Sequence, residues 1–182
     1  QLGGGISFVP AKNWLISLSA SREKKEGTGV IGGALASNSD QAVVGNTVTG
    51  LLPEPIDYTT DKFDIKLGFA DKKVQWELGY NMSLFDDNQD SLTWDNFQPG
   101  PDMPDVGRLA LPPDNQFHQA SLTAAYQVAD TTRLTTLVSA GVMLQDDDFQ
   151  PYRVGASTAA LPENSLDGKV YVYSARLGMT AR

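Results

Sequence analysis

Apolar and polar residues alternate along several stretches of the chain, and this alternation is its clearest pattern. In residues 63–69 and again in 74–84 every second residue is apolar, and a short charged segment at 71–73 separates the two stretches. Side chains on a β-strand point alternately to opposite faces, so the pattern predicts a hairpin with one apolar and one polar face. The apolar face of this hairpin is predicted to carry Phe63, Ile65, Leu67, Phe69, Trp76, Leu78 and Tyr80.

The same alternation predicts further strands. A second hairpin spans 119–144 with a turn at 129–132, and it places Leu122 and Tyr126 on its apolar face. A weaker pair of strands lies within residues 2–22, and a last strand runs over about 169–181. No segment has a helical period, so the chain is predicted to be all-β with about seven antiparallel strands.

Strand length and the order of the connections narrow the fold. Several predicted strands have about 10–12 residues, whereas strands of soluble proteins cluster near 5–6 and tilted strands of about 9–11 span a bilayer. Short turns near 10–13, 71–73 and 129–132 alternate with long polar loops rich in Pro, Gly and Asp, predicted at about 23–61, 86–117 and 145–168. An up-and-down meander places all short turns at one end, as in an outer-membrane barrel. A soluble β-sandwich is the alternative, but it favours shorter strands and does not require one-sided loops.

We therefore predict a transmembrane antiparallel up-and-down β-barrel, with residues 1–182 forming a segment of a single barrel domain in the bacterial outer membrane. Bacterial barrels normally have an even number of strands, and an open sheet edge has no partner for its backbone groups in lipid. About seven strands are thus expected to be part of a larger barrel.

Composition excludes several functions. The chain has 14 Lys and Arg against 22 Asp and Glu, a net charge of −8, which disfavours binding to a phosphate backbone. It has no cysteine and one histidine, which excludes cysteine-based metal or haem attachment and makes a hydrolase triad improbable. We predict no enzymatic activity and no cofactor of its own. His118 is interpreted as a surface residue at a strand end, with a contact in the lumen as the alternative.

Two sets of residues are candidate sites. The polar face is predicted to line the lumen and to contact a partner there, while the apolar residues named above contact lipid. The predicted lumen-facing residues are Gln75, Glu77, Asn81, Ser83, Gln119, Ser121, Thr123 and Gln127. Asp86, Asn88 and Asp90 are weak calcium candidates, because they resemble the start of a calcium loop but lack its glycine and its distant glutamate. A solvated loop is the simpler interpretation.

Four stretches of the chain resemble a known family. They include PIDYTTD at 55–61, SLFD through SLTWDNF at 83–97, LPPDNQ at 111–116, and TTRL through QDD, Phe149 and Pro151-Tyr152 at 131–152. In order and spacing these stretches resemble the MtrB/PioB family of outer-membrane proteins, which are associated with decahaem cytochromes.

The resemblance implies a porin-like barrel that sheathes a periplasmic multihaem c-type cytochrome and so enables extracellular electron transfer. The haem c would be carried by that partner in the lumen, and an extracellular multihaem cytochrome would dock on the outer loops. The alternative is a general diffusion porin or substrate channel.

Overall fold

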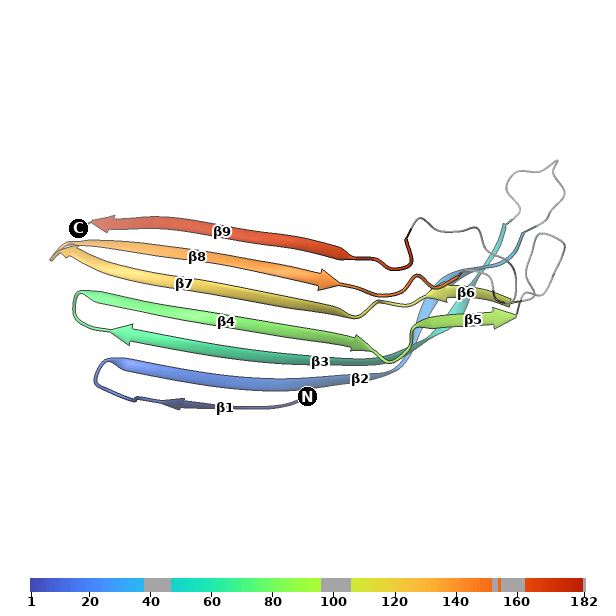
Figure 1. Ribbon diagram of the computed structural model, residues 1–182, viewed down its shortest axis with the longest axis horizontal. Helices are drawn as coiled ribbons and strands as arrows, with labels where there is room; N and C mark the ends of the chain where they lie inside the picture. The colour runs from blue at the N-terminus through green and yellow to red at the C-terminus, as the bar shows by residue number, and fades with distance from the viewer. Residues whose placement is uncertain (38–46, 96–105, 152–153, 155–162, 182) are drawn as a thin grey trace.

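A computed structural model describes residues 1–37, 47–95, 106–151, 154 and 163–181 of the chain. Within these residues every regular element is a β-strand, and no helix long and apolar enough to cross a membrane occurs among them. Seven strands form one antiparallel sheet in the order β1-β2-β3-β4-β7-β8-β9, as a single layer (Figure 1). They are β1 Leu2–Phe8, β2 Trp14–Ser37, β3 Thr47–Ala70, β4 Val74–Asp87, β7 Asn115–Ala129, β8 Thr132–Gln145 and β9 Gly168–Ala181. The prediction of an all-β meander is confirmed.

The short connections between β1 and β2, β3 and β4, and β7 and β8 all lie at one end of the sheet (Figure 1). In the first of them Asn13 adopts a left-handed backbone with a φ of 72°, which asparagine tolerates better than most residues. Its carbonyl accepts a hydrogen bond of 2.9 Å from the backbone N–H of Ala70, which joins this turn to the next hairpin. The predicted short turns are therefore in place.

The starts of the hairpins are staggered by a constant step. Trp14, Trp76 and Thr136 belong to one row of directly paired residues across the sheet. Trp14 is the first residue of β2, whereas β4 begins two residues before Trp76 and β8 begins four residues before Thr136. The shift is thus about one residue per strand, which corresponds to a tilt of about 35° for strands 4.8 Å apart. That is the tilt of strands in outer-membrane barrels.

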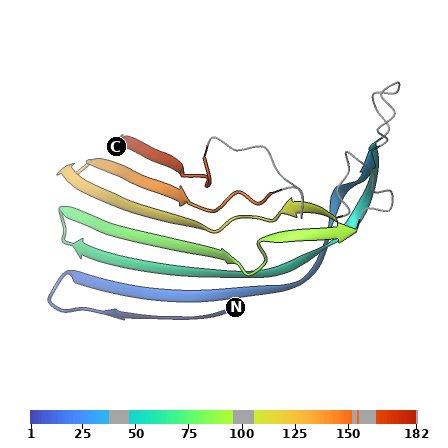
Figure 2. The same cartoon turned by 45° about the vertical axis from the view of Figure 1, so that its right-hand side comes forward.

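Strands β2 and β3 extend far beyond the other strands and turn away from the sheet, which Figures 1 and 2 both show. The prediction that residues 23–61 form a loop is therefore wrong for most of that segment. Prolines at 53 and 55 suggested a loop, but both pair with β2, opposite Val30 and Thr28. Proline is tolerated in a strand whose N–H side has no neighbour, and β4 pairs with β3 only as far as Tyr58. We call residues 27–37 and 47–56 the arm.

The second predicted loop, 86–117, also contains regular structure. A separate two-stranded sheet is formed by β5 Ser91–Asp95 and β6 Val106–Ala110. Trp94 of β5 packs on Gly107 of β6 so closely that a Cβ there would lie 2.6–2.8 Å from the indole ring. Glycine thus permits the indole ring to lie close against the partner strand. In the third predicted loop, 145–168, the described residues include an isolated bridge between Asp148 and Ser165, and residues 152–153 and 155–162 lie outside the described ones.

Both broad faces of the sheet are open. Among the described residues Leu111 is the one buried apolar side chain, at 6% exposure, whereas large apolar side chains such as Tyr173 at 74% are exposed along the strands. A single layer that leaves this much apolar surface in water would not be stable, because burial of apolar area is the main favourable contribution to folding. The apolar side of the sheet must therefore be covered by apolar material rather than by water.

Candidate functional site: two opposite faces of one sheet

The first face of the sheet is apolar across all seven strands. Directly paired residues share a face, and one row across the sheet reads Phe8, Ile16, Leu67, Leu78, Leu122, Val138 and Ala175. The rows on either side of it are also mostly apolar. The predicted apolar residues of both hairpins therefore lie together on one continuous surface, as the alternation indicated.

The apolar face extends from the short turns to a row of charged residues on the arm side. Towards the short turns it begins with a row that contains Val74, Tyr126, Leu134 and Met179. Towards the arm it ends at a row in which Asp61 pairs with Leu84, and Arg22 and Lys169 lie in the same row. Val74 and Leu84 are about 33 Å apart along the strand, which a tilt of about 35° reduces to a height of roughly 27 Å. This matches the apolar band of about 25 Å that outer-membrane barrels present to lipid.

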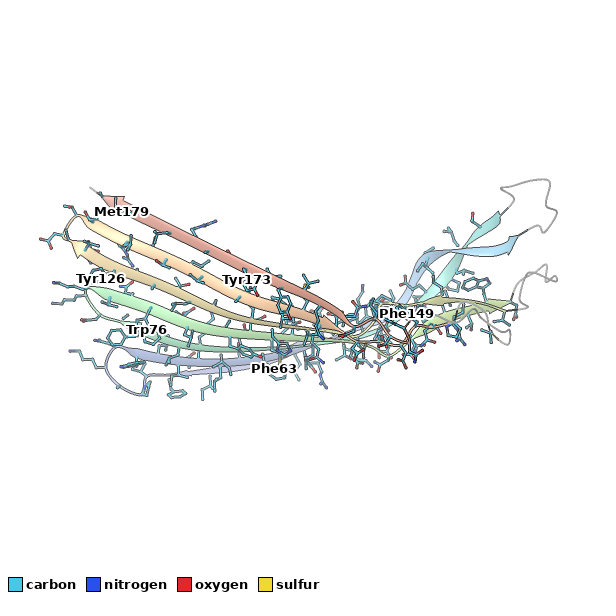
Figure 3. All side chains as sticks on the ribbon, turned by 45° about the horizontal axis from the view of Figure 1, so that its top comes forward. Phe63, Trp76, Tyr126, Phe149, Tyr173 and Met179 are labelled. Atoms are coloured by element: carbon cyan, nitrogen blue, oxygen red, sulfur yellow. The ribbon has the colours of Figure 1, made fainter. Side chains whose placement is uncertain are left out.

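Aromatic rings mark the border of this band near the short turns. Trp14 lies edge-on to Phe69 and to Trp76, with ring centroids 5.2 Å and 5.5 Å apart, and Phe69 stacks on Trp76 at 6.2 Å. Tyr126 lies one row closer to the turns. Such rings are typical of the girdle at a membrane–water interface. Figure 3 shows Trp76 and Tyr126 near the turn end, and Phe63 and Tyr173 farther along the sheet.

His118 lies on the apolar face rather than on the polar face. It pairs with Met82 and Val142, and its Nδ1 is 2.8 Å from the hydroxyl oxygen of Tyr80. The alternative of a lumen contact is therefore not supported, because its place in the alternation puts the ring on the other side of the sheet. A histidine bonded to a tyrosine near the arm-side border of the band suits an interface, where one end of the pair meets polar groups.

The second face of the sheet is polar and lined by small residues. The predicted residues do share this face: Glu77 pairs with Thr123, Asn81 with Gln119, and Ser121 with Gly79. Gln75 and Ser83 alternate with them on β4. Gln127 differs, because its amide donates to the carbonyl oxygens of Ala129 and Asp130, at 2.7 and 3.4 Å, and so supports the turn.

Hydrogen bonds and ion pairs run between strands on the polar face. Arg133 Nη2 donates to Gln75 Oε1 at 2.7 Å, and Asn81 Nδ2 donates to Asp64 Oδ1 at 2.8 Å. A longer ion pair of 3.7 Å joins Lys66 Nζ to Glu77 Oε1. Near the turns this face is hollowed by about 390 Å³, because Gly68, Ala70 and Ala125 leave space beside larger neighbours, which include Leu15, Glu77 and Arg133.

The calcium candidates do not converge. The amide of Asn88 donates to the carbonyl oxygen of Asp57 at 3.3 Å, and the Asp90 carbonyl accepts from the N–H of Leu111 at 3.0 Å. Across the described part of the chain no three His, Cys, Asp or Glu side chains are placed to hold a metal ion. Asp86, Asn88 and Asp90 therefore share no metal geometry here.

A buried carboxylate that sequence reasoning missed lies beside them. Asp87, at the end of β4, is 7% exposed, and its Oδ1 accepts from the N–H of Gln89 while its Oδ2 is buried without a hydrogen-bond partner. Burial raises the pKa of Asp87 above its usual value, and the nearby carboxylates of Asp114, Asp57 and Asp90 raise it further.

This raised pKa predicts a pH effect at the arm end of the sheet. Protonated Asp87 stabilises the folded state at pH values below its unfolded pKa, and this stabilisation is lost as pH rises through the higher folded pKa. Asp87→Asn, which imitates the protonated acid, should slow amide exchange of residues 88–95 at pH 7 and leave it unchanged at pH 3 after correction for intrinsic rates. The exposed neighbour gives the control: Asp86→Asn should have no such effect, and an equal effect of both variants would contradict the prediction.

The two faces together define the wall of a transmembrane β-barrel, because one side suits hydrocarbon and the other suits water or protein. Comparison with known proteins identifies it further. The sequence model of the outer membrane beta-barrel porin family MtrB/PioB matches residues 1–182. Over 185 aligned residues the chain is 30% identical to outer membrane protein MtrB of Shewanella baltica strain OS185, and the alignment covers 100% of this chain and 24% of that protein. The chain belongs to the MtrB/PioB family of bacterial outer-membrane β-barrel proteins.

Proposed function

We propose that this chain forms part of an outer-membrane barrel that sheathes a multihaem c-type cytochrome and so enables electron transfer across the outer membrane. The observation that carries the proposal is the pairing of an apolar band about 27 Å high with a polar face of mainly small residues. In the barrel the apolar face contacts lipid, and the polar face lines the lumen and contacts the partner.

The inner diameter expected for the barrel supports a lumen filled by protein. The described residues contribute seven strands to the sheet, and the chain covers 24% of its relative. A barrel of uniform strand density therefore has roughly 28 to 30 strands. Each tilted strand adds about 6 Å to the circumference, which gives a diameter of about 50 Å between backbones and about 40 Å between side chains. A folded domain of about 100 residues is roughly 35 Å across. Such a lumen is wide enough to enclose a protein.

The smooth polar face suits close contact with that protein. One row across it reads Ser7, Ser17, Lys66, Gly79, Ser121, Ser139 and Ser174, and a Cβ on Gly79 would lie 2.9 Å from the Ser121 hydroxyl. Small side chains let a partner approach the wall of the sheet closely. This chain has no cysteine for covalent haem attachment. In the proposed complex the partner carries the redox centres, and the barrel acts as a sheath and not as an enzyme.

The arm and the β5–β6 hairpin extend from the end of the sheet opposite the short turns (Figures 1 and 2). In bacterial barrels the short turns are periplasmic and the longer connections are outside. In the proposed complex these segments stand outside the cell, where they can dock an extracellular multihaem cytochrome.

The test is to purify the full-length protein from detergent-solubilised outer membranes and to record haem staining and an optical spectrum. A c-type haem protein at near-equal stoichiometry is the expected result. The family description as a porin favours one alternative, an open diffusion channel. A haem-free barrel that conducts ions in planar bilayers would establish that alternative and refute the sheath.

A further inference from the structure

The polar face of the sheet differs in its charge balance from the chain as a whole. The chain as a whole has a net charge of −8. On the polar face between the row of Arg133, next to the short turns, and the row of Lys62, however, the basic residues outnumber the acidic ones. The basic residues are Lys62, Lys66, Arg133 and Arg176, and the acidic ones are Asp64 and Glu77. We call the four basic residues the basic wall.

The acids on this face do not neutralise the basic wall. Glu77 lies 3.7 Å from Lys66, and Asp64 accepts a hydrogen bond from the neutral amide of Asn81. Within the described residues, Lys62, Arg133 and Arg176 form no ion pair.

Cations at the arm-side border behave differently. Arg22 binds Asp61 through two hydrogen bonds of 2.7 and 2.6 Å, and Lys169 lies 2.9 Å from Asp167. Lys24 likewise contacts the carboxylates of Glu26 and Asp57. The chain therefore pairs its cations where it has acids nearby, whereas Lys62, Arg133 and Arg176 of the polar face have no carboxylate partner among the described residues.

Arg133 is also accessible. It lines the hollow of about 390 Å³ beside Gly68, Ala70 and Ala125, so a side chain from outside can reach it there. Its Nη2 donates to the neutral oxygen of Gln75, and within the described residues its other N–H groups meet no carboxylate. A guanidinium in this setting can bind a carboxylate through a bidentate pair of hydrogen bonds.

We infer that the basic wall is a docking surface for an acidic protein surface, whose Asp and Glu carboxylates bind Lys62, Arg133 and Arg176. This inference rests on the proposed function, since it describes the protein that fills the lumen. Like charges placed against each other across an interface are costly, whereas opposite charges fix the register of the partner. The wall contributes net positive charge, so the facing surface of the partner carries net negative charge.

The test uses the full-length barrel, isolated with its lumen protein, and measures the rate at which that protein is released after dilution at low and high salt. The triple variant Lys62→Gln, Arg133→Gln, Arg176→Gln should release it about tenfold faster at low salt, since three exposed ion pairs together account for roughly that factor. Release from the wild type should accelerate with salt, and release from the variant should depend on salt much less.

Two further variants separate charge from shape and position. Lys62→Arg, Arg133→Lys, Arg176→Lys keeps the charge and should behave nearly as the wild type. Lys24→Gln, Lys25→Gln, Lys169→Gln removes the same charge away from this stretch of the polar face and should leave the release rate unchanged. The thermal midpoint of each empty barrel shows whether a variant still folds.

Each result bears on a different statement. Equal, salt-independent release from the wild type and the Gln variant would overturn the basic wall while leaving the sheath intact. A wild-type barrel that isolates with no lumen protein would refute the sheath, and the docking surface with it. Faster release from the Lys24→Gln, Lys25→Gln, Lys169→Gln variant as well would also overturn the inference, because it would show a general effect of charge.

Discussion

Leu122→Arg is expected to lower the free energy of unfolding of the full-length barrel in lipid vesicles by about 2–4 kcal/mol, the usual cost of an arginine near the middle of the membrane. Leu122 lies at the middle of the apolar band, directly between Leu78 and Val138 on the neighbouring strands. It is 40% exposed on the open sheet, so the lost stability comes from a charge placed in hydrocarbon rather than from a disrupted protein core. Urea titration followed by tryptophan fluorescence measures the difference.

The next residue provides a matched control. Thr123 points to the opposite face and pairs with Glu77, so Thr123→Arg places its guanidinium in a polar setting beside a carboxylate. Its effect on unfolding in the absence of the lumen protein should stay within about 0.5 kcal/mol. If the two arginine variants were equally destabilised, the assignment of the faces to lipid and lumen would be wrong.

Trp76→Ala is expected to cost about 2–3 kcal/mol, because it removes a large interfacial ring together with its contacts to Trp14 and Phe69. The contact between the two indoles can be isolated with a double-mutant cycle. Trp14→Ala, Trp76→Ala and the double variant should give a coupling energy of about 0.5–1.5 kcal/mol.

Tyr126→Ala serves as the comparison for Trp76→Ala. Tyr126 is 49% exposed and lies one row closer to the turns, outside the Trp14–Phe69–Trp76 cluster. It should cost less than Trp76→Ala and show no coupling to Trp14→Ala. A coupling energy of zero between Trp14 and Trp76 would mean that the rings anchor the band independently.

The strands within the band were predictable because the two environments of a barrel wall impose a period of two on the sequence. The alternation on both sides of 71–73 predicted that Leu67 and Leu78 share the apolar face, and in the structure they pair directly on it. The same logic predicted the shared face of Glu77 and Thr123. A residue's position in the alternation was thus enough to assign its face, without any knowledge of its contacts.

The arm and the β5–β6 hairpin were not predictable by this means. Outside the membrane neither face of a strand is obliged to be apolar, so the alternation weakens, and Pro53 and Pro55 favoured a loop. Asp87 was missed for a related reason, because its surroundings come from residues distant in sequence: its backbone N–H donates to Asp114, and the carboxylates of Asp57 and Asp114 raise its pKa. His118 was ambiguous because it was predicted to begin its strand, whereas β7 begins at Asn115 and includes His118 within its regular alternation.

The constant stagger of the hairpins has a consequence for how such proteins change size. Each hairpin repeats the same offset. The duplication or loss of one hairpin therefore preserves the tilt of every other strand and changes only the circumference of the barrel. One hairpin adds about 12 Å of circumference, or about 4 Å of diameter. The inner diameter of the barrel can therefore be matched to enclosed proteins of different width in small, regular increments, by evolution or by design. The remaining strands need no change.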